Sequence, residues 1–181
     1  MSRRQHCALP DFTRNLRSIA AHVASAYAGA ARPPQLLFIT PPPVHDAARV
    51  MHGVTRWGAE FDGQAERTNA TAARYAAAVA AVAAELKVPC VDAWAALQAD
   101  TNWRKTHLED GLHLAPPGSA ALFAALTDVI DTQLPHLAPD ALPFDFPEWY
   151  AVDAKEPVRR YARGKPLRAA LHACVLTGGA C

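Results

Sequence analysis

The sequence has almost no net charge and no long apolar run. Its 18 Lys and Arg residues and 17 Asp and Glu residues leave a formal net charge of +1, which excludes a surface built as a whole to bind nucleic acid or acidic lipid. No basic stripe with interleaved aromatic residues is present. No apolar stretch approaches the roughly 20 residues that a membrane-spanning helix needs. The sequence therefore predicts neither a nucleic-acid partner nor a membrane span.

Cysteine pairs with redox or metal-binding spacing are also missing. The four cysteines are Cys7, Cys90, Cys174 and Cys181, and this pattern predicts free thiols in a reducing compartment, the cytoplasm. No apolar segment follows Met1, which excludes a secretory signal, although the arginine-rich residues 1–32 also suit an organelle transit peptide. The histidines and acids of residues 45–52 and 107–113 match no standard ligand spacing, so no metal or cofactor is expected.

What is abundant is alanine, with 40 of 181 residues. Apolar side chains recur at helical spacing from Phe12 to Tyr27, and alanine makes residues 66–86 a strong helix. Between them, residues 36–40 form a short apolar run that predicts a strand buried on both faces. Residues 88–92 predict a second strand. Strand, helix and strand in this order favour a parallel crossover and an α/β fold.

Other segments show weaker patterns. Residues 44–65 have little periodicity and predict a long functional loop. A short helix is expected at residues 93–99, a polar loop at 100–117, and a long helix opening at Pro116. Residues 151–181 hold six Lys and Arg residues against two acids, which predicts a basic, solvated extension.

The segment Leu108 to Leu114 carries the most informative chemistry. In it, Asp110 and His113 stand three residues apart around Gly111. A carboxylate next to an imidazole fixes its tautomer and stabilises its cation, as a general base requires. The alternative is a simple Asp-Gly turn with a partly buried histidine.

Several motifs in order indicate a family. Asp-Gly-Leu-His-Leu at 110–114, followed by Pro-x-Gly and a helix, resembles the last conserved block of the SGNH (GDSL) hydrolases. The upstream motifs resemble the isoamyl-acetate-hydrolysing esterase branch; they are Gln5-His6, Asn15-Leu16-Arg17, Phe38 to Pro43, Glu66 to Asn69, Arg74 to Ala76 and Val88 to Trp94. The similarity covers about residues 5–150, and residues 151–181 lie outside it.

The resemblance implies a fold and a mechanism. The fold is a flavodoxin-like, three-layer α/β/α domain, of which residues 1–150 would form the C-terminal two-thirds. The activity is hydrolysis of small esters by a Ser-Asp-His triad, with His113 as general base and Asp110 orienting it. Pro41, Pro42, Pro43 and Val44 follow a strand at its carboxyl end, where such sheets place ligands, and are expected to line the substrate pocket.

The sequence departs from the family at the nucleophile. The Gly-Asp-Ser and Gly-x-Asn-Asp blocks are missing, and Ser2, Ser18, Ser25 and Ser119 lack the strand-to-turn context. Only the last two strands of the fold are expected, which leaves a sheet edge free to pair with another chain or a second copy. The sequence thus predicts a fragment, a mis-assigned start or a truncated paralogue. Two hypotheses follow, an esterase whose serine lies elsewhere and a non-catalytic remnant that acts by binding.

Overall fold

Two short parallel strands lie at the centre of the first of two compact units, residues 1–134 and 135–181. A computed structural model describes residues 6–31, 33–142, 150 and 155. The elements of the first unit are α1 (Leu9–Ala26), β1 (Phe38–Ile39), α2 (Asp46–Trp57), η2 (Gly58–Glu60), α3 (Asn69–Leu86), β2 (Cys90–Val91), α4 (Ala93–Gln98), α5 (Trp103–Thr106) and α6 (Pro116–Gln133). In the second unit, the described part contains η3 (Pro135–Leu137).

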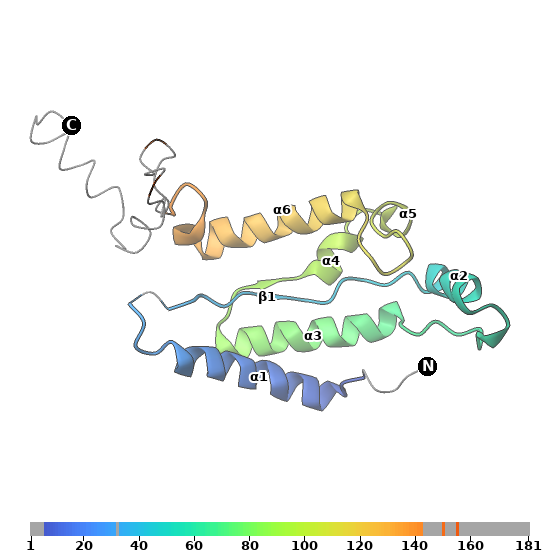
Figure 1. The fold of residues 1–181 in the computed structure, drawn as a ribbon, viewed down its shortest axis with the longest axis horizontal. Coiled ribbons are helices and arrows are strands. Elements are labelled where there is room, and N and C mark those ends of the chain that lie inside the picture. The colour runs from blue at the N-terminus through green and yellow to red at the C-terminus, as the bar shows by residue number, and fades with distance from the viewer. Residues whose placement is uncertain (1–5, 32, 143–149, 151–154, 156–181) are drawn as a thin grey trace, which may run out of the picture. The chain divides into compact units, whose positions relative to one another are not determined.

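The strands confirm the predicted parallel crossover. β1 pairs with β2 in parallel, with Phe38 opposite Cys90 and Ile39 opposite Val91. Figure 1 shows α1 and α3 on one side of β1, and α4 and α6 on the other. The described part of the first unit is therefore an α/β arrangement in three layers, as the sequence predicted.

The main apolar core lies between α1, α3 and β1. Its buried members are Ala20, Phe38, Val79, Val82 and Ala83. The small alanine side chains let the two helices approach closely, while the valines and Phe38 fill the space between them. Thr68 caps α3, because its side chain accepts a hydrogen bond from the backbone N–H of Thr71. The predicted helix is thus confirmed, with its first turn beginning at Asn69 rather than Glu66.

The prediction of a loop over residues 44–65 was wrong, because residues 46–57 form α2. Asp46 lies in the first turn and Arg56 in the last, where their charges complement the helix dipole. Gly53 is unusual within a helix, although residues 46–57 are amphipathic at helical spacing. It packs so closely on Phe61 that a Cβ atom would collide with the aromatic ring. Likewise, α5 is a short helix within the expected loop 100–117.

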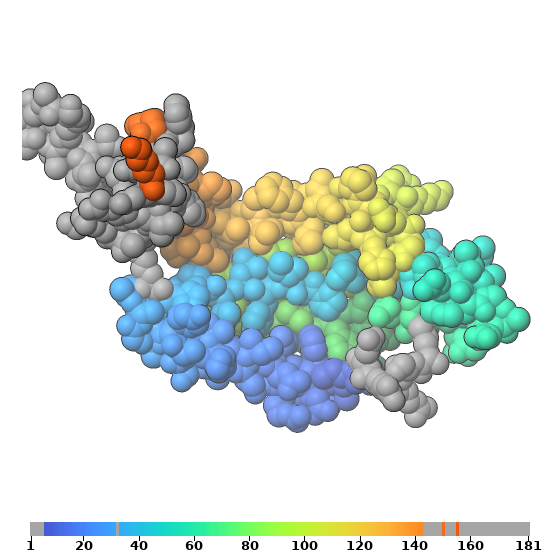
Figure 2. All heavy atoms as spheres, viewed as in Figure 1, coloured from blue at the N-terminus to red at the C-terminus, as the bar shows by residue number. Residues whose placement is uncertain are grey.

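Strand β1 is buried on one face only, which corrects a second prediction. Phe38 is 9% exposed, whereas Ile39 on the other face is 45% exposed. Within the described residues β1 has one partner strand, β2. Figure 2 shows the light-blue segment around β1 uncovered on the viewed face, between α1 and α6. One edge of the described sheet is therefore open.

Two further points concern the rest of the chain. Helix α6 begins at Pro116 as predicted, and no helix of the described residues is long and apolar enough to cross a membrane. Around the proposed boundary, residues 143–154, the structure describes only Tyr150, and of the basic extension it describes only Lys155, so both stay predictions. Among the described residues, those of the candidate site lie in the first unit.

Candidate active site

A tight loop presents the Asp-Gly-Leu-His motif. An antiparallel bridge between Leu108 and Leu114 closes it, and the Glu109 amide donates to the His113 carbonyl oxygen at 2.9 Å. At the tip, Gly111 adopts a φ of +85°, a conformation that favours glycine. The loop tip lies against α2, because the His45 amide donates to the Gly111 carbonyl at 2.9 Å. The loop is therefore fixed at its base and at its tip.

The structure brings Asp110 and His113 together. Oδ1 of Asp110 accepts the backbone amides of Leu112 and His113 at 3.0 and 2.9 Å, and Oδ2 lies 3.0 Å from Nδ1 of His113. Since an ionised carboxylate only accepts hydrogen bonds, Nδ1 is the protonated nitrogen in the neutral ring. The His113 side chain is 72% exposed. Nε2 is thus left available to a reacting group.

The pKa of Asp110 favours this role. Partial burial raises the pKa of the carboxyl, but the hydrogen bonds from the His113 amide and ring and from the Leu112 amide outweigh burial and hold the pKa well below its usual range. The carboxylate is therefore ionised at neutral pH. It can orient the imidazole and stabilise the imidazolium that forms when Nε2 takes a proton.

Sequence reasoning missed a buried arginine behind this pair. Nη1 of Arg49 in α2 lies 2.7 Å from Oδ2 of Asp110, and Nη2 contacts Oε1 of Glu66. The side chains of Arg49 and Glu66 are only 4% and 5% exposed. His52, also in α2, places Nδ1 at 3.9 Å from the same Asp110 oxygen. No local motif marks Arg49, because its partners stand 17 and 61 residues away.

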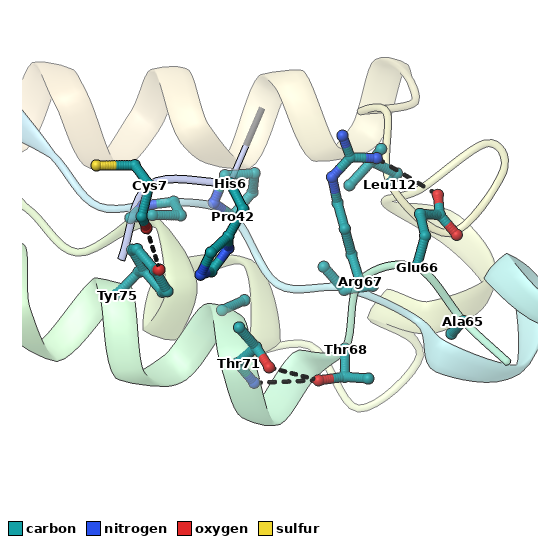
Figure 3. Close-up of a pocket in the computed structure, with 13 residues that line it drawn as sticks. His6, Cys7, Pro42, Ala65, Glu66, Arg67, Thr68, Thr71, Tyr75 and Leu112 are labelled. Carbon is teal, nitrogen blue, oxygen red and sulfur yellow. Dashed lines mark hydrogen bonds and ion pairs between the residues drawn. The ribbon is translucent and has the colours of Figure 1, made fainter. Parts of the chain in front are cut away.

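A cavity of about 800 Å³ shares Glu66 with this network (Figure 3). It is lined by three of the four residues predicted as pocket lining, namely Pro41, Pro42 and Val44; the fourth, Pro43, is fully buried and does not line it. The polar lining includes His6, Glu66, Arg67, Thr68, Thr71 and Tyr75. Leu112, next to His113, also lines the cavity, so the loop of residues 108–114 forms part of its wall.

Asn69 holds the proline-rich loop in place. Its Oδ1 accepts the Val44 amide at 3.2 Å and the Trp94 indole N–H at 3.0 Å. Its Nδ2 donates to Gln98 at 2.9 Å, and its backbone amide donates to Asp46 at 2.7 Å. Two of the motifs noted in the sequence therefore meet at one side chain, which fixes the loop after β1 against α3 and α4.

The described serines do not complete a triad. Ser18 and Ser25 lie in α1 and Ser119 lies in α6, and among the residues that the structure describes none of them bonds to His113. In the same part of the chain, no group of three or more His, Cys, Asp or Glu residues is arranged to hold a metal ion. The site as described is a carboxylate–imidazole pair next to a cavity whose lining includes the neighbouring Leu112 but neither Asp110 nor His113.

Comparison with known proteins identifies the class and then the family. A solved structure, the lipase/acylhydrolase from Enterococcus faecalis, superposes with a TM-score of 0.53 at 19% identity over 71% of this chain and 54% of that chain, which shows the fold. The GDSL-like Lipase/Acylhydrolase family model matches residues 3–121. The chain belongs to this family.

Curated relatives of this chain include esterases of the same kind. A GDSL esterase/lipase from Arabidopsis thaliana is 35% identical over 88% of this chain and 64% of its own length. An isoamyl acetate-hydrolyzing esterase 1 homolog from Bos taurus is 31% identical over 85% of this chain and 57% of its own length. The resemblance seen in the sequence is confirmed. The chain spans about three-fifths of the length of these relatives.

Proposed function

We propose that this chain contributes the acid/base half of an ester hydrolase that works through a Ser-Asp-His triad. The contact between Asp110 and His113 carries the proposal, because it engages Nδ1 and leaves Nε2 as the free ring nitrogen of a side chain that is 72% exposed. Family membership supports ester hydrolysis as the reaction. The serine would come from outside these 181 residues.

The chemistry follows from the position of the two side chains. His113 Nε2 takes the proton of the serine hydroxyl as its oxygen attacks the ester carbonyl, and Asp110 stabilises the imidazolium. As the tetrahedral intermediate collapses, the carbon–oxygen bond to the alcohol breaks and His113 returns the proton to the alkoxide. Water, deprotonated by the same imidazole, then attacks the acyl-serine; the bond between the acyl carbon and the serine oxygen breaks, His113 returns the proton to that oxygen, and the carboxylic acid is released. Asp110 stays ionised throughout.

The substrate we propose is a small ester bound in the cavity beside Leu112. Pro41, Pro42 and Val44 offer an apolar wall for an acyl or alcohol chain. Pro43 would act indirectly, since it is buried beneath that wall. The reaction needs no metal or cofactor. The thiol pattern supports a cytoplasmic location, with organelle import as the alternative to be separated by imaging a tagged chain.

A second function is favoured by the open edge of β1. Ile39 is 45% exposed, and in parallel pairing its N–H and C=O point away from β2. Another chain or a second copy could add a strand there. A non-catalytic protein that acts by such pairing would not require His113 to be exposed, so the two proposals differ in the role of this residue.

Activity after supplying a serine separates these proposals. A segment with the family's Gly-Asp-Ser and Gly-x-Asn-Asp blocks, taken from a curated relative, would be fused ahead of this chain and assayed with p-nitrophenyl acetate. We expect turnover that falls by about 10²-fold or more in His113→Ala, because general-base catalysis contributes on that order. His22→Ala, in the exposed part of α1, is the matched control. Equal turnover in both variants would reject the catalytic proposal.

A further inference from the structure

Arg49 joins three segments of the chain at one guanidinium. It extends from α2 to Glu66, which precedes α3, and to Asp110 in the catalytic loop. Nη1 also lies 3.4 Å from the main-chain oxygen of Asp110. With its side chain 4% exposed, Arg49 is nearly sealed from water. A buried charge at this position needs a reason, because desolvating it is costly.

We propose that Arg49 is a positioning residue, held in place by Glu66, that keeps Oδ2 of Asp110 directed at Nδ1 of His113. The inference rests on the proposed function of Asp110 and His113, and it assigns a role to two residues outside the triad. Arg49 touches no reacting atom. It acts through the carboxylate that it contacts.

The hydrogen bonds of Asp110 show how Arg49 adds to the two backbone amides. The amides hold Oδ1, but the χ2 torsion of an aspartate is broad and rotation about it moves both oxygens together, so a further contact at Oδ2 restricts the whole carboxylate. The planar guanidinium, at 2.7 Å from Oδ2 and 3.4 Å from the main-chain oxygen, restricts the plane of the carboxylate. With Arg49 in place, Oδ2 is held at 3.0 Å from the ring nitrogen.

The charges explain the presence of Glu66. Arg49 alone would neutralise Asp110 and remove its attraction for an imidazolium. With Glu66 included, the three side chains carry a net charge of −1, and protonation of His113 brings the group to zero. Two more groups face this cluster, namely the His52 ring at 3.9 Å from Asp110 and the Arg67 guanidinium at 3.4 Å from Glu66. The Arg67 side chain is 54% exposed, so solvent screens its charge.

The tautomer of His113 reports this positioning directly. In the full chain labelled with ¹⁵N in histidine, resonances assigned with His113→Ala would give the ratio of Nδ1–H to Nε2–H imidazole at a pH where the ring is neutral. We expect the Nδ1–H form to dominate in the wild type. Arg49→Met should lower the ratio by about threefold or more. Arg49→Lys should give a ratio between those of Arg49→Met and the wild type, because an ammonium keeps the positive charge but lacks the planar, two-pronged geometry of a guanidinium.

Controls separate positioning from folding and from the proposed function. Arg17→Met removes an arginine–carboxylate pair on the surface and should leave the ratio unchanged. A folded Arg49→Met variant with the wild-type ratio would overturn the inference and leave the triad proposal intact. A wild-type chain without the Nδ1–H form would contradict the triad proposal itself. If Arg49→Met fails to fold by circular dichroism, Arg49→Lys decides, since an unchanged ratio there overturns the positioning role.

Discussion

Two arginine–carboxylate pairs in this chain share their chemistry and differ in their surroundings. Arg17 in α1 binds Glu85 in α3 through contacts of 2.6 to 3.1 Å, with both side chains about half exposed. Arg49 binds Glu66 and Asp110 with the guanidinium buried. At the surface, water can solvate a charged group whose partner has been removed. In the interior no water takes the partner's place, so losing one member of a buried pair destabilises the fold far more.

Different interactions therefore stabilise two contacts in the fold: that of α1 with α3, and that of α2 with the loop of residues 108–114. Apolar side chains join α1 to α3, and the Arg17–Glu85 pair is an addition at the rim. The contact between α2 and the loop of residues 108–114 depends on the hydrogen bonds and ion pairs of Arg49. Gly111 lies where this loop approaches the start of α2. Substitutions in the two regions should accordingly differ in size and in pH dependence.

The largest effect is expected from Arg49→Met. Removing the guanidinium leaves Asp110 and the buried Glu66 without the cation that they share, with only the half-exposed Arg67 still near Glu66, and should lower the free energy of unfolding by about 3–5 kcal/mol. Urea denaturation followed by circular dichroism measures this. A loss no greater than that of Arg17→Met would show that burial does not distinguish the two pairs.

Gly111→Ala should have the next largest effect. At a φ of +85° an alanine is strained, and its Cβ would lie 2.7 Å from Cβ of Ala48 and 2.8 Å from the His45 oxygen. We expect a loss of about 1–3 kcal/mol in the free energy of unfolding. Gly29→Ala is the control, since a Cβ there meets nothing within 4 Å. Equal thermal midpoints for the two variants would mean that the loop is not seated on α2 as described.

Asp110→Asn should change the acid dependence of stability. A carboxyl whose pKa is lower in the folded than in the unfolded state stabilises the fold above its unfolded pKa, near 3.9, and this stabilisation is lost as pH falls toward the folded pKa. The difference in urea midpoint between wild type and Asp110→Asn should therefore shrink below about pH 4. Asp131→Asn, on the exposed side of α6, serves as control. A difference that is constant with pH would argue against the lowered pKa.

Arg17→Met should have the smallest effect. Both partners are exposed, and hydrogen bonding to each other lowers the pKa of Glu85 and raises that of Arg17 without enclosing either group. We expect a thermal midpoint close to that of the wild type, and closer still in 1 M salt, where surface pairs are screened. A large drop in the thermal midpoint that does not depend on salt would mean that the Arg17–Glu85 pair stabilises the fold as the buried Arg49 pairs do.

The comparison also shows what the sequence could predict. The alanine and valine stripe of α3, the parallel crossover and the Asp110–His113 pair depend on short-range spacing, and all three could be recognised. Helix α2 was missed because Gly53, the histidines and the charged residues suggest a loop, although residues 46–57 are amphipathic at helical spacing. The close contact between Gly53 and Phe61 is visible only in the structure. The role of Arg49 was missed because its partners, Glu66 and Asp110, are distant from it in the sequence. The exposure of Ile39 depends on what packs around β1, and the apolar residues next to it in the sequence do not reveal this.

The activation of a serine by His113 is the central claim, and covalent trapping tests it most directly. In the fused chain with a Gly-Asp-Ser segment, a fluorophosphonate probe should label the serine rapidly. The labelling rate should fall by about 10²-fold or more in His113→Ala and stay unchanged in His22→Ala. Equal labelling rates for the wild type and His113→Ala would contradict the account, because the serine would then react without the imidazole.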